Sequence, residues 1–156
     1  MSDCEVAYGD GRATIDKIWF ENHDGKESNI FECSQKISLN YKVKFHQDVS
    51  DVQFSFMIKT KDGVSLFGTD TSHLNKIKNK RFSAGDEYVM KFEVGNSFAP
   101  GAYYINCGLR DDTNDVPVFL HRRIDSAIFK VVADEMTATK AGLLNFPVKF
   151  SLDPLN

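Results

Sequence analysis

Residues 36–45 read KISLNYKVKF, a run in which apolar and polar side chains alternate without a break. One side carries Ile37, Leu39, Tyr41, Val43 and Phe45, and the other carries Lys36, Ser38, Asn40, Lys42 and Lys44. A period of two is that of an antiparallel strand with one face in the core and the other in solvent. This run therefore predicts a half-buried β-strand.

The same period recurs along most of the chain. It predicts further strands over residues 51–60, 86–94, 101–110, 116–121 and 127–132. Turn-forming pairs such as Asp24-Gly25 and Asp62-Gly63 separate the runs. Strands at this spacing, without helical patterns between them, indicate an all-β sandwich or barrel. Residues 134–144 are expected to form a connector, and residues 144–152 a last, detached strand.

The first long strand contains a change of parity. Ala13 and Ile15 share one side, whereas Ile18 and Phe20 share the other. A bulge between the two pairs would turn all four side chains inward and leave Trp19 facing outward. Without a bulge, Trp19 belongs to the core. The sequence leaves both arrangements open.

Composition narrows the class of protein. The 156 residues are 42% hydrophobic, which suffices for one domain, residues 1–156, with its own core; the 13 phenylalanines suit a β-rich interior. A net charge of −3 argues against a nucleic-acid surface, and neither a membrane span nor a secretory leader is expected. Cys4, Cys33 and Cys107 are odd in number and far apart, which favours reduced thiols in a cytoplasmic protein.

The glycine-rich opening, YGDGRATI at residues 8–15, is not a nucleotide loop. A phosphate-binding loop needs two glycines separated by four residues and a following lysine at a strand-to-helix junction. Here Gly9 and Gly11 are separated by one residue and lead into a strand. We therefore expect a sharp entry turn with Arg12 at the sheet edge, and no cofactor.

Metal and thiol chemistry are also disfavoured. The histidines are isolated in the sequence: His23, His46, His73 and His121. The acidic run at residues 111–115 lacks the glycine and the distal glutamate of an EF-hand loop, so an acidic hairpin tip is expected and no metal is assigned. Cys107 has inward parity, and burial in apolar surroundings raises the pKa of a thiol.

Several side chains that are predicted to face outward are of the types that bind sugars. Pyranose rings offer apolar faces and hydroxyl groups, so a lectin-like site pairs flat aromatic rings with planar polar groups. Strand parity and, for Trp19, the bulge give these carbohydrate-binding candidates: Trp19, Gln53, Ser55, Tyr104, Asn106, Arg110, Phe119 and His121.

Four stretches of the sequence, taken in their order along the chain, carry a resemblance to a known family. They are YGDGRATI, DGVSLFGTDT at residues 62–71, PGAYYINCGL at residues 100–109 and AIFKVV at residues 127–132. Together they resemble the C-terminal carbohydrate-binding domain of Wzt-type ATPase subunits, from ABC transporters that export O-antigen polysaccharide. The resemblance covers nearly the whole chain. No sugar-contacting residue transfers through it, because those positions vary with the glycan.

The resemblance implies a jelly-roll-like antiparallel β-sandwich that binds the non-reducing end of O-antigen polysaccharide without catalysis. It implies a cytoplasmic location at the inner membrane, with an ATPase domain before residue 1 that contacts the membrane subunit; Met1 would then not be the natural start. It further implies a homodimer in which Phe146, Val148 and Phe150 belong to an exchanged C-terminal strand. Residues 67–71 are expected to form a structural turn, capped by Thr69 and Thr71, away from the sugar.

Two alternatives stay open. One is a small jelly-roll enzyme acting on glycosides, which needs two carboxylates about 5–10 Å apart across a cleft. Its candidates would be Glu87, Glu93, Asp112 and Asp125. The other is a structural dimerisation module that binds no ligand, in which the outward residues scatter and do not converge.

Overall fold

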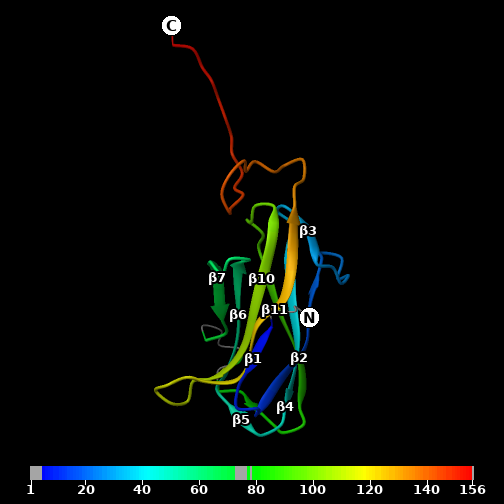
Figure 1. The fold of residues 1–156 in the computed structure, drawn as a ribbon, viewed down its shortest axis with the longest axis vertical. Helices are drawn as coiled ribbons and strands as arrows, with labels where there is room; N and C mark the ends of the chain where they lie inside the picture. Colours follow the sequence, from blue (N-terminus) through cyan, green and yellow to red (C-terminus); the bar gives the residue numbers. More distant parts are fainter. Residues whose placement is uncertain (1–4, 73–76, 78, 156) are drawn as a thin grey trace.

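The computed structural model describes residues 5–72, 77 and 79–155, and this part of the chain is all-β. Its strands are β1 (Val6–Tyr8), β2 (Ala13–Glu21), β3 (Ile30–Glu32), β4 (Ile37–Phe45), β5 (Val49–Ser50), β6 (Val52–Thr60), β7 (Ser65–Asp70), β8 (Arg81–Phe82), β9 (Glu87–Val94), β10 (Gly101–Asp111) and β11 (Val118–Val132). The all-β fold predicted from the alternating runs is confirmed, and it is the antiparallel β-sandwich that the resemblance implies (Figure 1).

Two sheets face each other. The large sheet has the strand order β1-β11-β10-β6-β7, and the short β3 pairs in parallel with the end of β11. The small sheet has the order β2-β4-β9, while β5 pairs with β8. Tyr41 of β4 spans the interior, where its hydroxyl donates to the carbonyl oxygens of Ser55 on β6 (3.3 Å) and Gly108 on β10 (3.4 Å).

Aromatic rings fill much of the space between the sheets. The ring centroid of Phe129 on β11 lies 5.3 Å from that of Phe20 on β2 and 5.4 Å from that of Tyr103 on β10. Phe31 and Phe98 also contact Phe129, and all five side chains are buried. The phenylalanine-rich composition is thus accounted for by the core.

The predicted inward-facing side chains are confirmed on three of the predicted strands. The inward side chains of β4, β6 and β10 are buried, whereas those of the edge strand β9 are only half-buried. An edge strand has a neighbour on one side only, so its inward residues keep part of their contact with water.

The two strands predicted over residues 116–121 and 127–132 are in fact one continuous strand, β11. A bulge interrupts its register with β10 between Arg123 and Ala127. Within it, Asp125 adopts a left-handed φ of 55° and donates its N–H to Oδ1 of Asn106 (3.0 Å). A bulge breaks the alternation in the same way as a loop does, which is why the sequence pattern suggests two strands.

The bulge considered for the first long strand is present in β2, between Ile15 and Ile18. Arg123 of β11 stabilises it by donating from Nη1 to the carbonyl oxygens of Ile15 (3.2 Å) and Asp16 (2.6 Å). Trp19 therefore faces outward, and of the two arrangements open from the sequence, the one with a bulge is correct.

The glycines near the N-terminus serve a close backbone approach. A Cβ atom on Gly9 would lie 2.2 Å from the carbonyl oxygen of Leu120, so only glycine fits there. The N–H groups of Asp10 and Gly11 donate to the carbonyl oxygens of Phe119 and Leu120, each at 3.1 Å. The entry turn predicted for this segment is confirmed, with Arg12 paired to Asp111 at 2.8 Å.

The C-terminal segment leaves the sandwich. Residues 134–144 form bends and turns, and Leu144 makes an isolated bridge with Phe98. After Asn145 the chain runs away from the body of the molecule (Figure 1). Residues 146–155 form no strand in this structure. Phe146, Val148 and Phe150 are 57%, 75% and 85% exposed.

Two further expectations concern membranes and thiols. In the described ranges, no helix combines the length and the apolarity that crossing a membrane requires. Cys33 and Cys107 are buried free thiols. Cys4 and His73 lie outside the described residues.

Candidate functional site

The outer face of the large sheet carries six of the eight candidates. It brings together Gln53 and Ser55 from β6, Tyr104, Asn106 and Arg110 from β10, and Phe119 from β11. Register explains the convergence, because Arg110 pairs with both Gln53 and Phe119 across the sheet. Side chains on one face of neighbouring strands lie within reach of one another.

A hollow of about 280 Å³ lies on this face. It is lined by Ser55, Phe56, Met57, Gly68, Thr69, Asp70, Asn106, Cys107, Gly108, Arg110, Phe119 and Arg122. Four of these form one row across the sheet, because Arg122 pairs with Gly108, Gly108 with Ser55, and Ser55 with Asp70. The row runs from a guanidinium to a carboxylate over two small residues.

Glycine keeps the floor of the hollow low. A Cβ atom on Gly108 would lie 2.9 Å from Oγ of Ser55 and 3.1 Å from the ring of Phe119. On Gly68 of β7, which also lines the hollow, it would lie 2.7 Å from the side chain of Met57. Glycine inside a strand often marks a place where a ligand or another backbone approaches closely.

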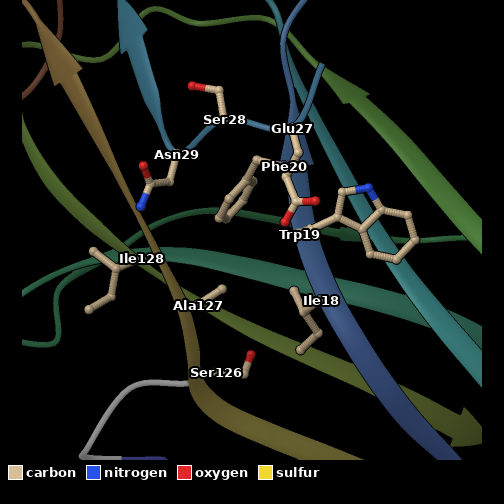
Figure 2. Close-up of a pocket in the computed structure, with 9 residues that line it drawn as sticks. All are labelled: Ile18, Trp19, Phe20, Glu27, Ser28, Asn29, Ser126, Ala127 and Ile128. Atoms are coloured by element: carbon tan, nitrogen blue, oxygen red, sulfur yellow. The ribbon is translucent and has the colours of Figure 1, made fainter. Parts of the chain in front are cut away.

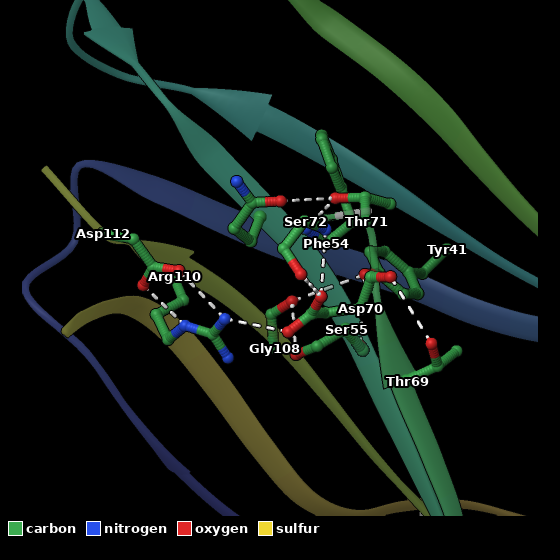
Figure 3. A network of polar contacts seen from close by, with 11 residues as sticks. Tyr41, Phe54, Ser55, Thr69, Asp70, Thr71, Ser72, Gly108, Arg110 and Asp112 are labelled. Atoms are coloured by element: carbon green, nitrogen blue, oxygen red, sulfur yellow. Dashed lines mark hydrogen bonds and ion pairs between the residues drawn. The ribbon is translucent and has the colours of Figure 1, made fainter. Parts of the chain in front are cut away.

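An ion-pair network forms one wall (Figure 3). Arg110 donates from Nε to Asp112 (2.6 Å) and from Nη2 to Asp112 and Asp70 (2.9 Å each). Partial burial alone would raise the pKa of Asp70, but hydrogen bonds from Ser72 and Arg110 outweigh it and lower that pKa to about 2. Asp70 is therefore a fixed, ionised hydrogen-bond acceptor at neutral pH.

Two amides on this face each keep an unused donor group. Oδ1 of Asn106 accepts from Asp125, and Oε1 of Gln53 accepts from Oγ1 of Thr71 (3.0 Å). The oxygen of each amide is thus occupied, while its nitrogen has no hydrogen-bond partner within the described part of the chain. A fixed amide with an unused N–H₂ group is suited to donating to a sugar hydroxyl.

The opposite wall is aromatic and cationic. The guanidinium of Arg122 lies 5.0 Å from the ring centroid of Phe119, and its Nη1 donates to the hydroxyl of Tyr8 (2.9 Å). Tyr8 also packs edge-on against Phe119, with 6.0 Å between the centroids. These contacts hold Phe119 and Arg122 in fixed positions.

Two candidates do not join this face. The outward orientation expected for His121 is wrong: it pairs with the inward Leu109, and its Nδ1 accepts from the N–H of Ile15 (2.8 Å). Burial and the nearby Arg123 lower the pKa of His121, which favours the neutral acceptor. Trp19 faces outward, but on the small sheet, where its Nε1 donates to Glu21 (3.0 Å).

A larger hollow, of about 500 Å³, lies between β2 and β11 (Figure 2). Its hydroxyl groups are used locally, because Ser126 donates to the carbonyl oxygen of Ile105 (3.1 Å) and Ser28 to that of Ile30 (3.0 Å). The indole of Trp19 extends from β2 to the side away from Ile128. Trp19 alone of the eight candidates lines this hollow, whereas Ser55, Asn106, Arg110 and Phe119 line the one on the large sheet, so the latter is the better candidate.

Residues 67–71 correct a further expectation. They are not a turn: all but Thr71 belong to β7, and Asp70 lines the hollow that the sequence placed elsewhere. The capping by Thr71 is confirmed, since its Oγ1 accepts from the N–H of Phe54 (3.0 Å). Asp70, Gly108 and Arg122 were missed as site residues. Outward parity indicated Gly108. A second irregularity of β11, between Phe119 and His121, hid the parity of Arg122.

The chemistry of the hollow favours binding. Asp70 is its sole lining carboxylate among the described residues, and its low pKa leaves no proton to donate at neutral pH. Burial raises the pKa of Cys107 to about 12, so its thiol stays protonated. Over the described ranges, no group of three or more His, Cys, Asp or Glu side chains is arranged to hold a metal ion.

Comparisons with known proteins agree with the earlier resemblance. The family model described as "Wzt C-terminal domain" matches residues 5–146. A solved structure described as "Crystal structure of the C-terminal domain of wzt" superposes with a TM-score of 0.81 at 26% identity, covering 97% of this chain and 90% of that one. A Niemann-Pick type C2 protein from the Japanese carpenter ant matches with a TM-score of 0.48 at 14% identity, over 85% of this chain and 98% of its own. No curated protein sequence matches the chain.

Proposed function

Because the chain belongs to the Wzt C-terminal domain family, we propose that it is a non-catalytic domain which binds the non-reducing end of O-antigen polysaccharide. Family membership is consistent with a role in an O-antigen ABC transporter. In this proposal, glycan binding couples recognition of a finished polysaccharide to its export. The domain works in the cytoplasm at the inner membrane, attached through an ATPase domain to the membrane subunit.

The hollow on the large sheet carries the proposal. The ring of Phe119, the free amide donor of Asn106 and the fixed carboxylate of Asp70 line it over a glycine floor. A terminal sugar would stack on Phe119 and exchange hydrogen bonds with Asn106, Gln53 and Asp70. Such sites bind weakly, because each sugar hydroxyl gives up good hydrogen bonds to water. Tyr104 lies two residues before Asn106 on the same face, where it would contact the next sugar.

The proposed function is tested by adding a methyl group to the glycine floor of the hollow. Gly108→Ala is expected to weaken binding of the source strain's O-polysaccharide by about tenfold or more, equivalent to about 1.4 kcal/mol. Phe119→Ala, which removes the stacking ring and adds no atom, should weaken it similarly. The matched control is Gly95→Ala, because a Cβ atom there meets nothing within 4 Å.

Isothermal titration gives the affinities, and thermal unfolding checks that each variant folds. Failure of the wild-type chain to bind the polysaccharide or its terminal fragment would refute the proposed function. Unchanged binding by folded Gly108→Ala and Phe119→Ala variants would place the glycan elsewhere.

The exposed C-terminal segment supports the homodimer. Phe146, Val148 and Phe150 share one parity and lie exposed on an unpaired extended chain. Apolar side chains gathered on such a segment usually mark an interaction surface. We therefore propose that this segment pairs with a second copy, whose own segment returns the contact. Two glycan sites in one dimer would raise the effective affinity for a repeating chain.

Sedimentation equilibrium tests the exchange. The full chain is expected to be a dimer, and Phe150→Asp is expected to shift it toward the monomer by placing a charge in the strand interface. Val116→Asp serves as the control, because Val116 is 73% exposed and lies in the loop before β11. A monomeric wild-type chain would contradict the exchange.

A further inference from the structure

Arg122 differs from the other arginines around the large sheet. Arg12 pairs with Asp10 and Asp111, Arg110 with Asp70 and Asp112, and Arg123 with Glu5. Within the described part of the chain, no carboxylate forms an ion pair with Arg122. It is nevertheless half-buried and held in place, by the hydroxyl of Tyr8 and the ring of Phe119.

The contacts of Arg122 leave one edge of its guanidinium unused. Nη1 donates to Tyr8, whereas Nε and Nη2 have no partner among the described residues. The Nε and Nη2 groups form a planar fork of two donors, which matches the two oxygens of a carboxylate or phosphate. A fork already fixed by its neighbours loses little side-chain entropy when it binds an anion.

The two walls of the hollow carry opposite charges. Arg122 stands on the β11 wall and Asp70 on the β7 wall, three strand spacings away, or about 14 Å. On the β7 side, Asp70 and Asp112 share the single cation of Arg110, which leaves one negative charge there. The β11 wall therefore attracts an anionic group, and the β7 wall accepts hydrogen bonds from hydroxyl groups.

We propose that this hollow takes an acidic sugar residue, whose carboxylate or phosphate binds the Nε–Nη2 edge of Arg122 while its hydroxyl groups face Asp70. The inference rests on the proposed function and specifies the chemical class of the sugar. A neutral sugar would leave the fixed cation of Arg122 without a counter-charge in the bound state. The acidic sugar supplies that charge and gains hydrogen bonds to a charged donor, which are stronger than neutral ones.

The test is an NMR titration with three small probes at matched concentrations: methyl glucuronide, glucose 6-phosphate and the neutral methyl glucoside. At least one acidic probe is expected to shift the backbone amides of Ser55 and Gly108 and the Nε–H signal of Arg122, more strongly than the glucoside does. A response to the glucuronide alone assigns a carboxylate, and a response to the phosphate alone assigns a phosphate. Added salt should weaken the response.

Variants separate a ligand contact from a structural role. Arg122→Gln is expected to weaken binding of the acidic probe by about tenfold or more. Arg122→Lys is expected to keep part of the affinity because it keeps the charge. Arg81→Gln is the matched control, since Arg81 is exposed on β8 and does not line the hollow. Thermal unfolding of each variant reports whether the loss of Arg122 affects folding.

Equal shifts from the glucoside, no shift from either acidic probe, or full affinity in Arg122→Gln would overturn the acidic-sugar assignment. The proposed function fails by a different result, namely the absence of any response of the hollow to the O-polysaccharide. A polysaccharide that binds the hollow with the same affinity in wild type and Arg122→Gln would preserve the function and refute the acidic sugar.

Discussion

Replacing Phe129 with alanine is expected to lower the free energy of unfolding by about 3–5 kcal/mol. Phe129 is 1% exposed and contacts four other aromatic rings, from both sheets and from the loop before β10. Its removal leaves a cavity that strand backbones cannot close, because the ladders of hydrogen bonds fix the distance between the sheets. Urea denaturation followed by tryptophan fluorescence measures the loss.

Phe67→Ala is the matched control for this substitution. Phe67 is 47% exposed on the edge strand β7 and contacts Phe56. Its replacement is expected to cost less than about 1 kcal/mol, in keeping with surface positions. Similar losses in the two variants would show that the aromatic cluster around Phe129 is not the centre of stability.

Replacing Arg123 with methionine is expected to cost about 3–5 kcal/mol, because it breaks a buried ion pair and leaves one partner unpaired. Arg123 is 8% exposed and binds Glu5 through Nε and Nη2. It also supplies the donors for the two carbonyl oxygens at the β2 bulge. The variant therefore leaves a buried carboxylate and the bulge carbonyls without their donor.

A double variant distinguishes these two contributions. Adding Glu5→Met to Arg123→Met removes the unpaired carboxylate and is expected to recover part of the loss. The loss of stability that remains in the double variant measures the contribution of the hydrogen bonds to the carbonyl oxygens of the bulge. Arg81→Met, at an exposed site, should change the stability by less than about 0.5 kcal/mol. A loss below about 1 kcal/mol in Arg123→Met would show that the bulge does not depend on this side chain.

Much of the candidate site was predictable from the sequence. Outward parity on β6 and β10 identified Gln53, Ser55, Tyr104, Asn106 and Arg110, because neighbouring strands of a sheet bring every second residue to one face. The same argument failed for His121, since the irregularity of β11 between Phe119 and His121 shifts its parity. It could not separate Trp19 from the others either, because parity gives a face but not the sheet to which that face belongs.

Alternation by itself determined that this protein is all-β, where most of its long strands lie, and which side of β4, β6 and β10 is buried. Those properties are local, since they depend on residues i and i+2 of one strand. The order β11-β10-β6-β7 and its register were decided only by the tertiary structure, and these set Arg122 opposite Asp70 across a glycine floor. Register depends on contacts between residues far apart in the chain, which no local pattern specifies.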